Sequence, residues 1–149
     1  MTSDTVLVTG GTGFLGSYVA EDLVGAGHDV VAYDLSTDDR ILAKLGVADE
    51  VTIRRGDVSE ATDVVRAVRE TGATHVVHLA ALLTNTAREN PRSALDVNVV
   101  GTNNVLEAAR TFDDQVDRVA WASSAAVYAP PYNYDTRFVD EDEIGRAHV

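Results

Sequence analysis

Short apolar runs alternate with amphipathic segments along most of this chain. Five runs rich in Val, Ile, Leu and Ala have the length of buried strands, at residues 5–8, 29–34, 51–57, 74–80 and 118–123. Between them, apolar residues recur at helical spacing in segments 15–24, 60–70 and 93–110, and more weakly in 41–45. This alternation predicts an α/β fold, a doubly wound parallel sheet with right-handed crossovers and the strand order 3-2-1-4-5.

Glycines cluster where the first predicted strand turns into the first helix. Gly10, Gly13 and Gly16 form the pattern G-x-x-G-x-x-G within the run Thr9–Gly16. The first glycine allows a tight turn, the second a close approach of backbone to phosphate, and the third close packing of the helix on the strand. A flexible loop is the alternative interpretation, but the flanking strand and helix favour a Rossmann-type dinucleotide site, with the pyrophosphate at the helix N-terminus.

An acidic residue ends the second predicted strand. Asp34 follows Gly16 by 18 residues, close to the spacing at which a carboxylate accepts hydrogen bonds from the adenosine ribose 2′-OH. The same charge repels a 2′-phosphate, so the sequence favours NAD over NADP as the cofactor. A solvated carboxylate at the strand end is the alternative, and the nearby Arg40 could soften the preference for NAD.

Composition and charge narrow the class of protein. The chain has 149 residues, a length that suits one domain. Its net charge of −12 argues against a nucleic-acid partner. It contains no cysteine, which excludes disulfides, thiolate metal sites and cysteine nucleophiles; we expect no metal site. No apolar run is long enough to span a membrane, and residues 1–4 do not resemble a signal peptide, so we expect a cytoplasmic protein with no membrane partner.

Taken together, the motifs resemble those of the extended short-chain dehydrogenases/reductases, the NAD-dependent epimerase/dehydratase family that includes UDP-glucose 4-epimerase-like proteins. The resemblance covers residues 5 to about 143 and rests on the segments Thr9–Gly16, Gly56–Val58, His78–Ala81, Asn98–Thr102 and Ala122–Tyr128. It implies an incomplete NAD-binding Rossmann domain over residues 1–143, truncated before a sixth strand.

The resemblance also implies roles for individual residues. The implied cofactor-binding residues are Gly10, Gly13, Phe14, Leu15, Gly16, Asp34, Asp57, Val58, Leu79, Ala80, Ala81 and Asn98. Asp57 would accept a hydrogen bond from the adenine amino group, and Ser124, four residues before Tyr128, would be the catalytic hydroxyl that faces the substrate, with Ser123 as the fallback. As alternatives, both serines could cap the strand end, Asn98 could tie its helix to a loop, and His78 is better interpreted as a buried strand residue than as a base.

The residues that would complete the chemistry are missing from the sequence. In the resembled family a tyrosine acts as general acid and base, and a lysine four residues later lowers its pKa; this sequence contains no Tyr-x-x-x-Lys, and its only lysine is Lys44. We therefore expect the chain itself to be inactive or nearly so. The parent protein is expected to be an NAD-dependent oxidoreductase of the epimerase, dehydratase or dehydrogenase type that acts on a small molecule, a nucleotide sugar, and forms a homodimer. The alternatives are a non-catalytic NAD(P)-sensing regulatory protein of the same fold and a scaffold that lost the cofactor.

The last six residues, 144–149, do not follow the family pattern. Their sequence IGRAHV can be encoded by ATC-GGA-AGA-GCA-CAC-GTC, the start of a widely used sequencing adapter. We hypothesise that this tail is an artefact of the reading frame running into adapter. A genuine divergent tail and a deliberately designed end are the alternatives.

Overall fold

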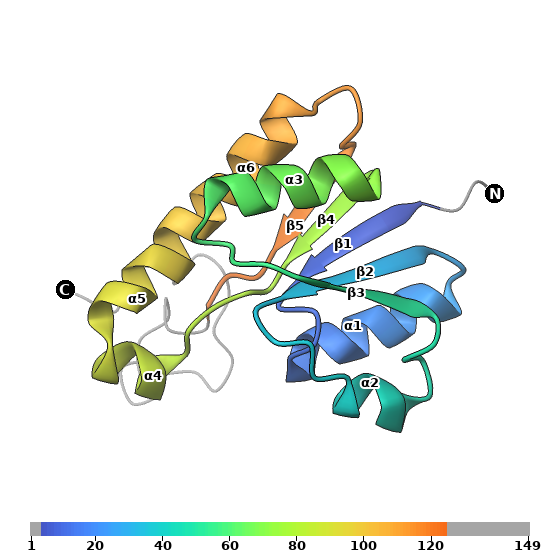
Figure 1. Cartoon of the computed structure of the whole chain (residues 1–149), viewed down its shortest axis with the longest axis horizontal. Helices are drawn as coiled ribbons and strands as arrows, with labels where there is room; N and C mark the ends of the chain where they lie inside the picture. Colours follow the sequence, from blue (N-terminus) through green and yellow to red (C-terminus); the bar gives the residue numbers. More distant parts are fainter. Residues whose placement is uncertain (1–3, 125–149) are drawn as a thin grey trace, which may run out of the picture.

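The apolar runs form a parallel sheet in the computed structural model, which describes residues 4–124 (Figure 1). The strands are β1 (Thr5–Thr9), β2 (Asp29–Asp34), β3 (Val51–Arg55), β4 (His75–His78) and β5 (Arg118–Trp121). They pair in the order β3-β2-β1-β4-β5, and every pair is parallel. The predicted fold class and strand order are therefore confirmed.

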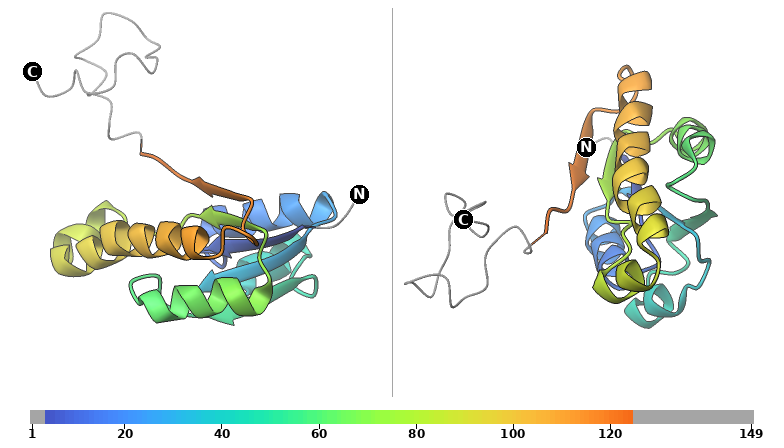
Figure 2. Two further views of the ribbon diagram at one scale, coloured as in Figure 1. Left: turned by 90° about the horizontal axis from the view of Figure 1, so that it is seen from above. Right: turned by 90° about the vertical axis from the view of Figure 1, so that its left-hand side faces the viewer.

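Helices cover both faces of the sheet, because successive residues of a strand point to opposite sides. Val6 and Val8 of β1 pack toward α1 (Phe14–Gly25) and α2 (Arg40–Leu45), whereas Leu7 packs toward α3 (Ala61–Thr71) and α6 (Thr102–Thr111). Figure 1 shows these two helix pairs on opposite sides of the strands, and the views of Figure 2 show the same layers edge-on. Each face thus has its own apolar core, and the sheet that separates them holds the site at its carboxyl edge.

The long helix predicted over residues 93–110 is continuous from α5 (Pro91–Leu95) through α6, but the segment between β4 and α6 adds a short helix before it and a π-helical turn within it. These are α4 (Thr84–Glu89) and η1 (Asp96–Gly101). Helix α4 is short and polar and gives no hydrophobic period, so the pattern could not indicate it. The wide turn of η1 brings Gly101 so close to Val58 that a Cβ at Gly101 would lie 2.8 Å from the Val58 Cγ2 atom.

Strand register brings the loops that follow the strands to one edge. Thr9 lies opposite both Tyr33 and His78, and His78 lies opposite Trp121. The chain segments after β1, β2, β4 and β5 therefore meet there, which is where ligands bind in open parallel sheets. None of the helices within residues 4–124 combines the length and the apolar composition that a membrane-spanning helix needs.

Candidate functional site

Gly10 makes the turn after β1 and lies between the ends of β2 and β4. Its φ is 68°, in the left-handed region, and its N–H donates to the Tyr33 carbonyl at 2.9 Å. A Cβ at Gly10 would lie only 2.9 Å from the backbone nitrogen of Ala80. Only glycine satisfies both the dihedral angle and the close approach. The structure thus brings the predicted residues Gly10 and Ala80 into direct contact at the carboxyl edge of the sheet.

Gly16 lets helix α1 pack directly on this turn, and Gly11 lets the turn pack on β2. A Cβ at Gly16 would overlap the carbonyl oxygen of Gly10, so the close packing is with the turn after β1, whereas the glycine pattern had suggested the strand itself. Gly11 was not among the predicted site residues, yet a Cβ there would lie 2.6 Å from the Ala32 Cα. Its only sequence signal was its place beside Gly10 directly after the strand.

The first turn of α1 presents backbone donors at the site. Gly13 is the extended N-cap residue, no side chain caps this helix end, and no acidic residue lies in the first turn. The first N–H groups of a helix lack intrahelical partners and, with the helix dipole, favour an anion. The predicted residues Phe14 and Leu15 follow here, with side chains that are largely exposed. The arrangement can receive a pyrophosphate on backbone N–H groups.

Asp34 at the end of β2 organises the loops on either side of it. Its Oδ2 accepts from the Thr12 N–H at 3.2 Å, and its Oδ1 accepts from the Ser36 N–H at 3.2 Å. A carboxylate offers about four acceptor positions, so two remain available to ribose hydroxyls. Thr12, which was not among the predicted site residues, ties the glycine turn to this carboxylate.

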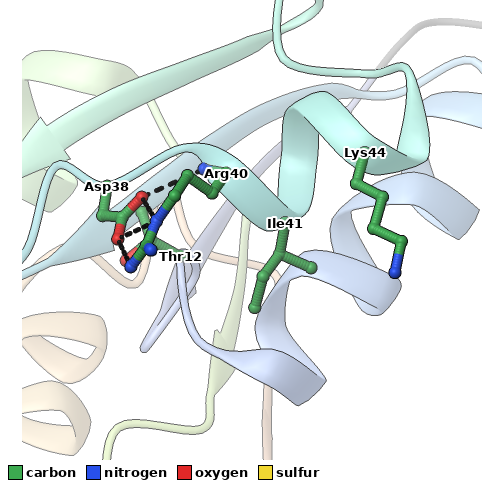
Figure 3. Close-up of a pocket in the computed structure, with 5 residues that line it drawn as sticks. All are labelled: Thr12, Asp38, Arg40, Ile41 and Lys44. Carbon is green, nitrogen blue, oxygen red and sulfur yellow. Dashed lines mark hydrogen bonds and ion pairs between the residues drawn. The ribbon is translucent and has the colours of Figure 1, made fainter.

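A cavity of about 300 Å³ lies beside this carboxylate (Figure 3). It is lined by Thr12, Asp38, Arg40, Ile41 and Lys44. The guanidinium of Arg40 is paired with Asp38, whose Oδ1 accepts from Nε at 2.9 Å and whose Oδ2 accepts from Nε at 2.8 Å. This pairing holds the pKa of the Asp38 carboxyl below its ordinary value. Arg40, which could have softened the preference for NAD, therefore has its charge engaged within the loop.

Asp57 lies in the loop after β3, beside the ring of Tyr33. Its Oδ1 accepts from the backbone N–H and the hydroxyl of Ser59, at 2.8 and 2.7 Å, and Oδ2 accepts no hydrogen bond within the described residues. The Tyr33 hydroxyl donates to the Asp57 carbonyl at 3.1 Å. Burial, together with the negative charges of Asp63 and Asp57, raises the pKa of Tyr33 far above its ordinary value, so this phenol stays a donor.

The Val58 side chain is buried in the core between β1 and α6, so Val58 can reach a ligand only through its backbone. The Asn104 amide fixes that backbone, since its Nδ2 donates to the carbonyls of Val58 and Ser59 at 2.9 and 3.1 Å. Asn104 was not predicted as a site residue. A buried amide on a predicted apolar helix face was the signal that could have found it.

His78 is a buried residue that connects β1, β4 and α6. Its Nδ1 lies 2.7 Å from the Thr9 Oγ1, and its Nε2 lies 3.0 Å from the Thr102 Oγ1. The Thr9 Oγ1 also accepts from the N–H groups of Leu79 and Ala80, both at 3.2 Å. Burial lowers the pKa of His78 and favours its neutral form. The interpretation as a buried strand residue is confirmed.

Two further predicted residues flank the loop after β4. Asn98 makes a pair of hydrogen bonds with Leu82: its Oδ1 accepts from the Leu82 N–H at 2.8 Å, and its Nδ2 donates to the Leu82 carbonyl at 3.0 Å. Asn98 therefore ties η1 to the segment that follows Leu79–Ala81. Ala81 itself is exposed, so a ligand can approach the backbone closely at this point.

Ser123 and Ser124 follow β5 at the same edge and are exposed. The Ala122 N–H donates to the His78 carbonyl at 3.3 Å, which sets the serines one strand away from Leu79–Ala81. Tyr128 and the tail at 144–149 lie outside the described residues. Within residues 4–124, no group of three or more His, Asp or Glu side chains could hold a metal ion.

Known proteins share both the sequence pattern and this architecture. The sequence model described as "NAD dependent epimerase/dehydratase family" matches residues 6–145. UDP-glucuronate 4-epimerase 4 of Arabidopsis thaliana is 32% identical over 93% of this chain and 33% of its own length. A putative UDP-glucose 4-epimerase of Methanocaldococcus jannaschii is 34% identical over 87% of this chain and 41% of its own.

A solved structure agrees with these sequence relatives. The UDP-glucose 4-epimerase of Thermus thermophilus, solved in complex with NAD, is 35% identical and superposes with a TM-score of 0.77. The comparison covers 94% of this chain and 43% of that one. The chain thus spans between a third and somewhat more than two fifths of the length of these relatives.

Proposed function

Because the chain belongs to the NAD-dependent epimerase/dehydratase family, we propose that its described residues bind NAD as the cofactor half of a nucleotide-sugar epimerase or dehydratase. One observation carries the proposal: the glycine turn, the Asp34 carboxylate and the backbone of Ala80 converge at one edge of the sheet. Turn and carboxylate are linked through the Thr12 N–H, so the pyrophosphate and ribose positions form one unit.

The residues present fit NAD on structural grounds. Gly10 and Ala80 leave no room for a Cβ between them, and Gly13 leaves the α1 N-terminus uncapped. In the proposed complex the free backbone N–H groups at the N-terminus of α1 hold the pyrophosphate. Asp34 accepts from the adenosine ribose through its two remaining acceptor positions, and the Asp57 Oδ2 accepts from the adenine amino group. Leu79, Ala80 and Ala81 pass closely beneath the nicotinamide side.

When bound, NAD supplies a hydride acceptor for a sugar hydroxyl carbon. The chain's own contribution to that step is Ser124, which we propose holds the reacting oxygen by a hydrogen bond, with Ser123 as the fallback. The sequence has no Tyr-x-x-x-Lys to move the proton. We therefore propose that residues 1–149 bind the dinucleotide but do not turn over a nucleotide sugar, and that the complete protein supplies the missing base.

Isothermal titration of the purified chain with NAD tests the proposal. We expect saturable binding, and a melting temperature that rises by about 3 °C or more at roughly millimolar NAD. Asp34→Asn should weaken NAD binding by about tenfold, because it removes the charge that the ribose hydroxyls meet. Asp49→Asn is the matched control, since Asp49 is exposed and precedes the amino end of β3, at the opposite edge of the sheet.

Failure of NAD to bind the wild-type chain, or equal weakening by the two variants, would contradict the proposal. The alternative, a non-catalytic NAD(P)-sensing protein of the same fold, shares the binding result and differs in chemistry. An epimerase assay on UDP-glucose and UDP-glucuronate with the complete protein separates them, since interconversion of the 4-epimers occurs only in the enzyme.

A further inference from the structure

The cavity beside Asp34 carries charges that the NAD site does not use. It is bounded by Thr12, whose N–H is bonded to Asp34, and by Arg40 and Lys44 of α2 (Figure 3). It therefore lies next to the carboxylate proposed to receive the ribose 2′-OH. A cofactor that carried a 2′-phosphate would place that group in or beside this cavity.

The cations of this cavity are of the kind that recognise a 2′-phosphate. An arginine near the end of the second strand accommodates that group in dinucleotide-binding folds, and guanidinium and ammonium groups both bind phosphate. Arg40 and Lys44 are four residues apart on α2 and line the same space, so they face it together. By themselves these two side chains would favour NADP.

Asp38 opposes that preference. Both of its carboxylate oxygens accept from the Arg40 side chain, which engages the fork that would otherwise meet a phosphate. Its Oδ1 also accepts from the Arg40 backbone N–H at 3.1 Å, which fixes the carboxylate at the start of α2. Asp38 thus adds a second negative charge on the same side as Asp34 and ties up the arginine.

We propose that Asp38 is a specificity-determining residue, which excludes the 2′-phosphate of NADP by holding Arg40 and by presenting its own charge to the cavity. The inference rests on the dinucleotide site of the proposed function and adds a residue outside the glycine turn and Asp34. Because the Asp38–Arg40 pair is exposed and such pairs are weak, the effect is expected to be about three- to fivefold in affinity.

Titration calorimetry of NAD and NADP against the purified chain and its Asp38→Asn variant tests this inference. Asn retains a side-chain carbonyl for the Arg40 backbone N–H but loses the charge, so the loop keeps its anchor. We expect NADP to bind about three- to fivefold more tightly to the variant, while NAD affinity changes by less than about twofold. The gain should shrink in the double variant Asp38→Asn/Arg40→Gln, because the released guanidinium is one of its two sources and the loss of the Asp38 charge is the other.

Asp39→Asn is the matched control, because it removes the same charge from an exposed neighbour that does not line the cavity. An equal gain in Asp39→Asn would overturn the inference in favour of a bulk charge effect. An unchanged NADP affinity in Asp38→Asn would overturn it and leave the proposed function intact, provided that NAD binds. A wild-type chain that binds neither dinucleotide would overturn both.

Discussion

The Thr9 hydroxyl oxygen lies 2.7 Å from the Nδ1 atom of His78, although the two residues are 69 positions apart in the chain. This hydrogen bond joins the last residue of β1, which leads into the glycine turn, to the last residue of β4, which leads into Leu79–Ala81. The two backbone segments proposed to lie against the cofactor are therefore fixed to each other through one buried side-chain pair.

Replacing His78 by Asn should destabilise the fold by about 2–3 kcal/mol, because Thr9 and Thr102 lose a buried partner. The variant should also alter the pH dependence. Burial lowers the pKa of His78 in the folded state, so the unfolded chain binds the proton first as the pH falls. This contribution to stability is complete above the unfolded pKa of about 6.5 and is lost as the pH falls from there through the folded pKa.

Urea unfolding at several pH values between about 7.5 and about 5 measures both effects for His78. The difference in free energy of unfolding between wild type and His78→Asn should shrink as the pH falls. A constant difference over this range would show that His78 does not titrate differently in the folded and unfolded states.

Gly16→Ala should abolish NAD binding and destabilise the chain by about 2–4 kcal/mol, because the new Cβ would overlap the Gly10 carbonyl and push α1 off the turn. Gly25→Ala is the matched control in the same helix, where a Cβ would meet nothing within 4 Å. There we expect a change of less than about 1 kcal/mol, in the stabilising direction. Thermal unfolding with and without NAD distinguishes the two, and similar effects of both substitutions would contradict the packing argument.

Asn104→Ala should cost about 2–3 kcal/mol, because the carbonyls of Val58 and Ser59 lose a buried donor and a small cavity forms. The neighbouring Asn103 is exposed, so Asn103→Ala should change stability by no more than about 0.5 kcal/mol. Chemical denaturation of the two variants makes the comparison. If the proposed adenine contact of Asp57 is correct, only Asn104→Ala should also weaken NAD binding.

Salt should stabilise this chain. Its net charge is −12, so carboxylates repel one another in the folded state at low ionic strength. The Debye length falls from above 10 Å to about 3 Å between roughly 0.05 M and 1 M salt. We expect the free energy of unfolding to rise over that range in NaCl. Equal stability at both concentrations would show that this repulsion is negligible.

The sheet and the glycine turn could be predicted from the sequence because they depend on local signals. Apolar runs of strand length alternating with helical patterns fix the strand order once right-handed crossovers are assumed. Gly10 directly follows the first strand and Asp34 ends the second, so both could be found by their positions relative to these strands. The roles of these residues toward NAD stay predictions, since they require a ligand.

The rest of the site depends on tertiary contacts that no local pattern encodes. Gly11 must be a glycine because Ala32 of β2 packs against it, and the Thr12 N–H bonds the carboxylate of Asp34. The Asn104 side chain donates to carbonyls that lie 45 and 46 positions away in the chain. The π-helical turn of η1 could not be predicted either, because residues 96–101 have the composition of an ordinary helix. These contacts are visible only after β2, β3 and α6 have been placed around β1.

The hydrogen bonds around His78 have a fixed order of donors and acceptors. The Thr102 hydroxyl donates to the Asn98 carbonyl at 2.8 Å, so toward His78 its oxygen can only accept, and Nε2 must carry the proton. Nδ1 is then the acceptor of the Thr9 hydroxyl, whose oxygen remains open to the two amides of Leu79 and Ala80. The imidazole is thereby locked in a single tautomer, and a proton added at Nδ1 would occupy one of the two acceptor positions of the Thr9 oxygen, so that only one of the two amides could keep its hydrogen bond.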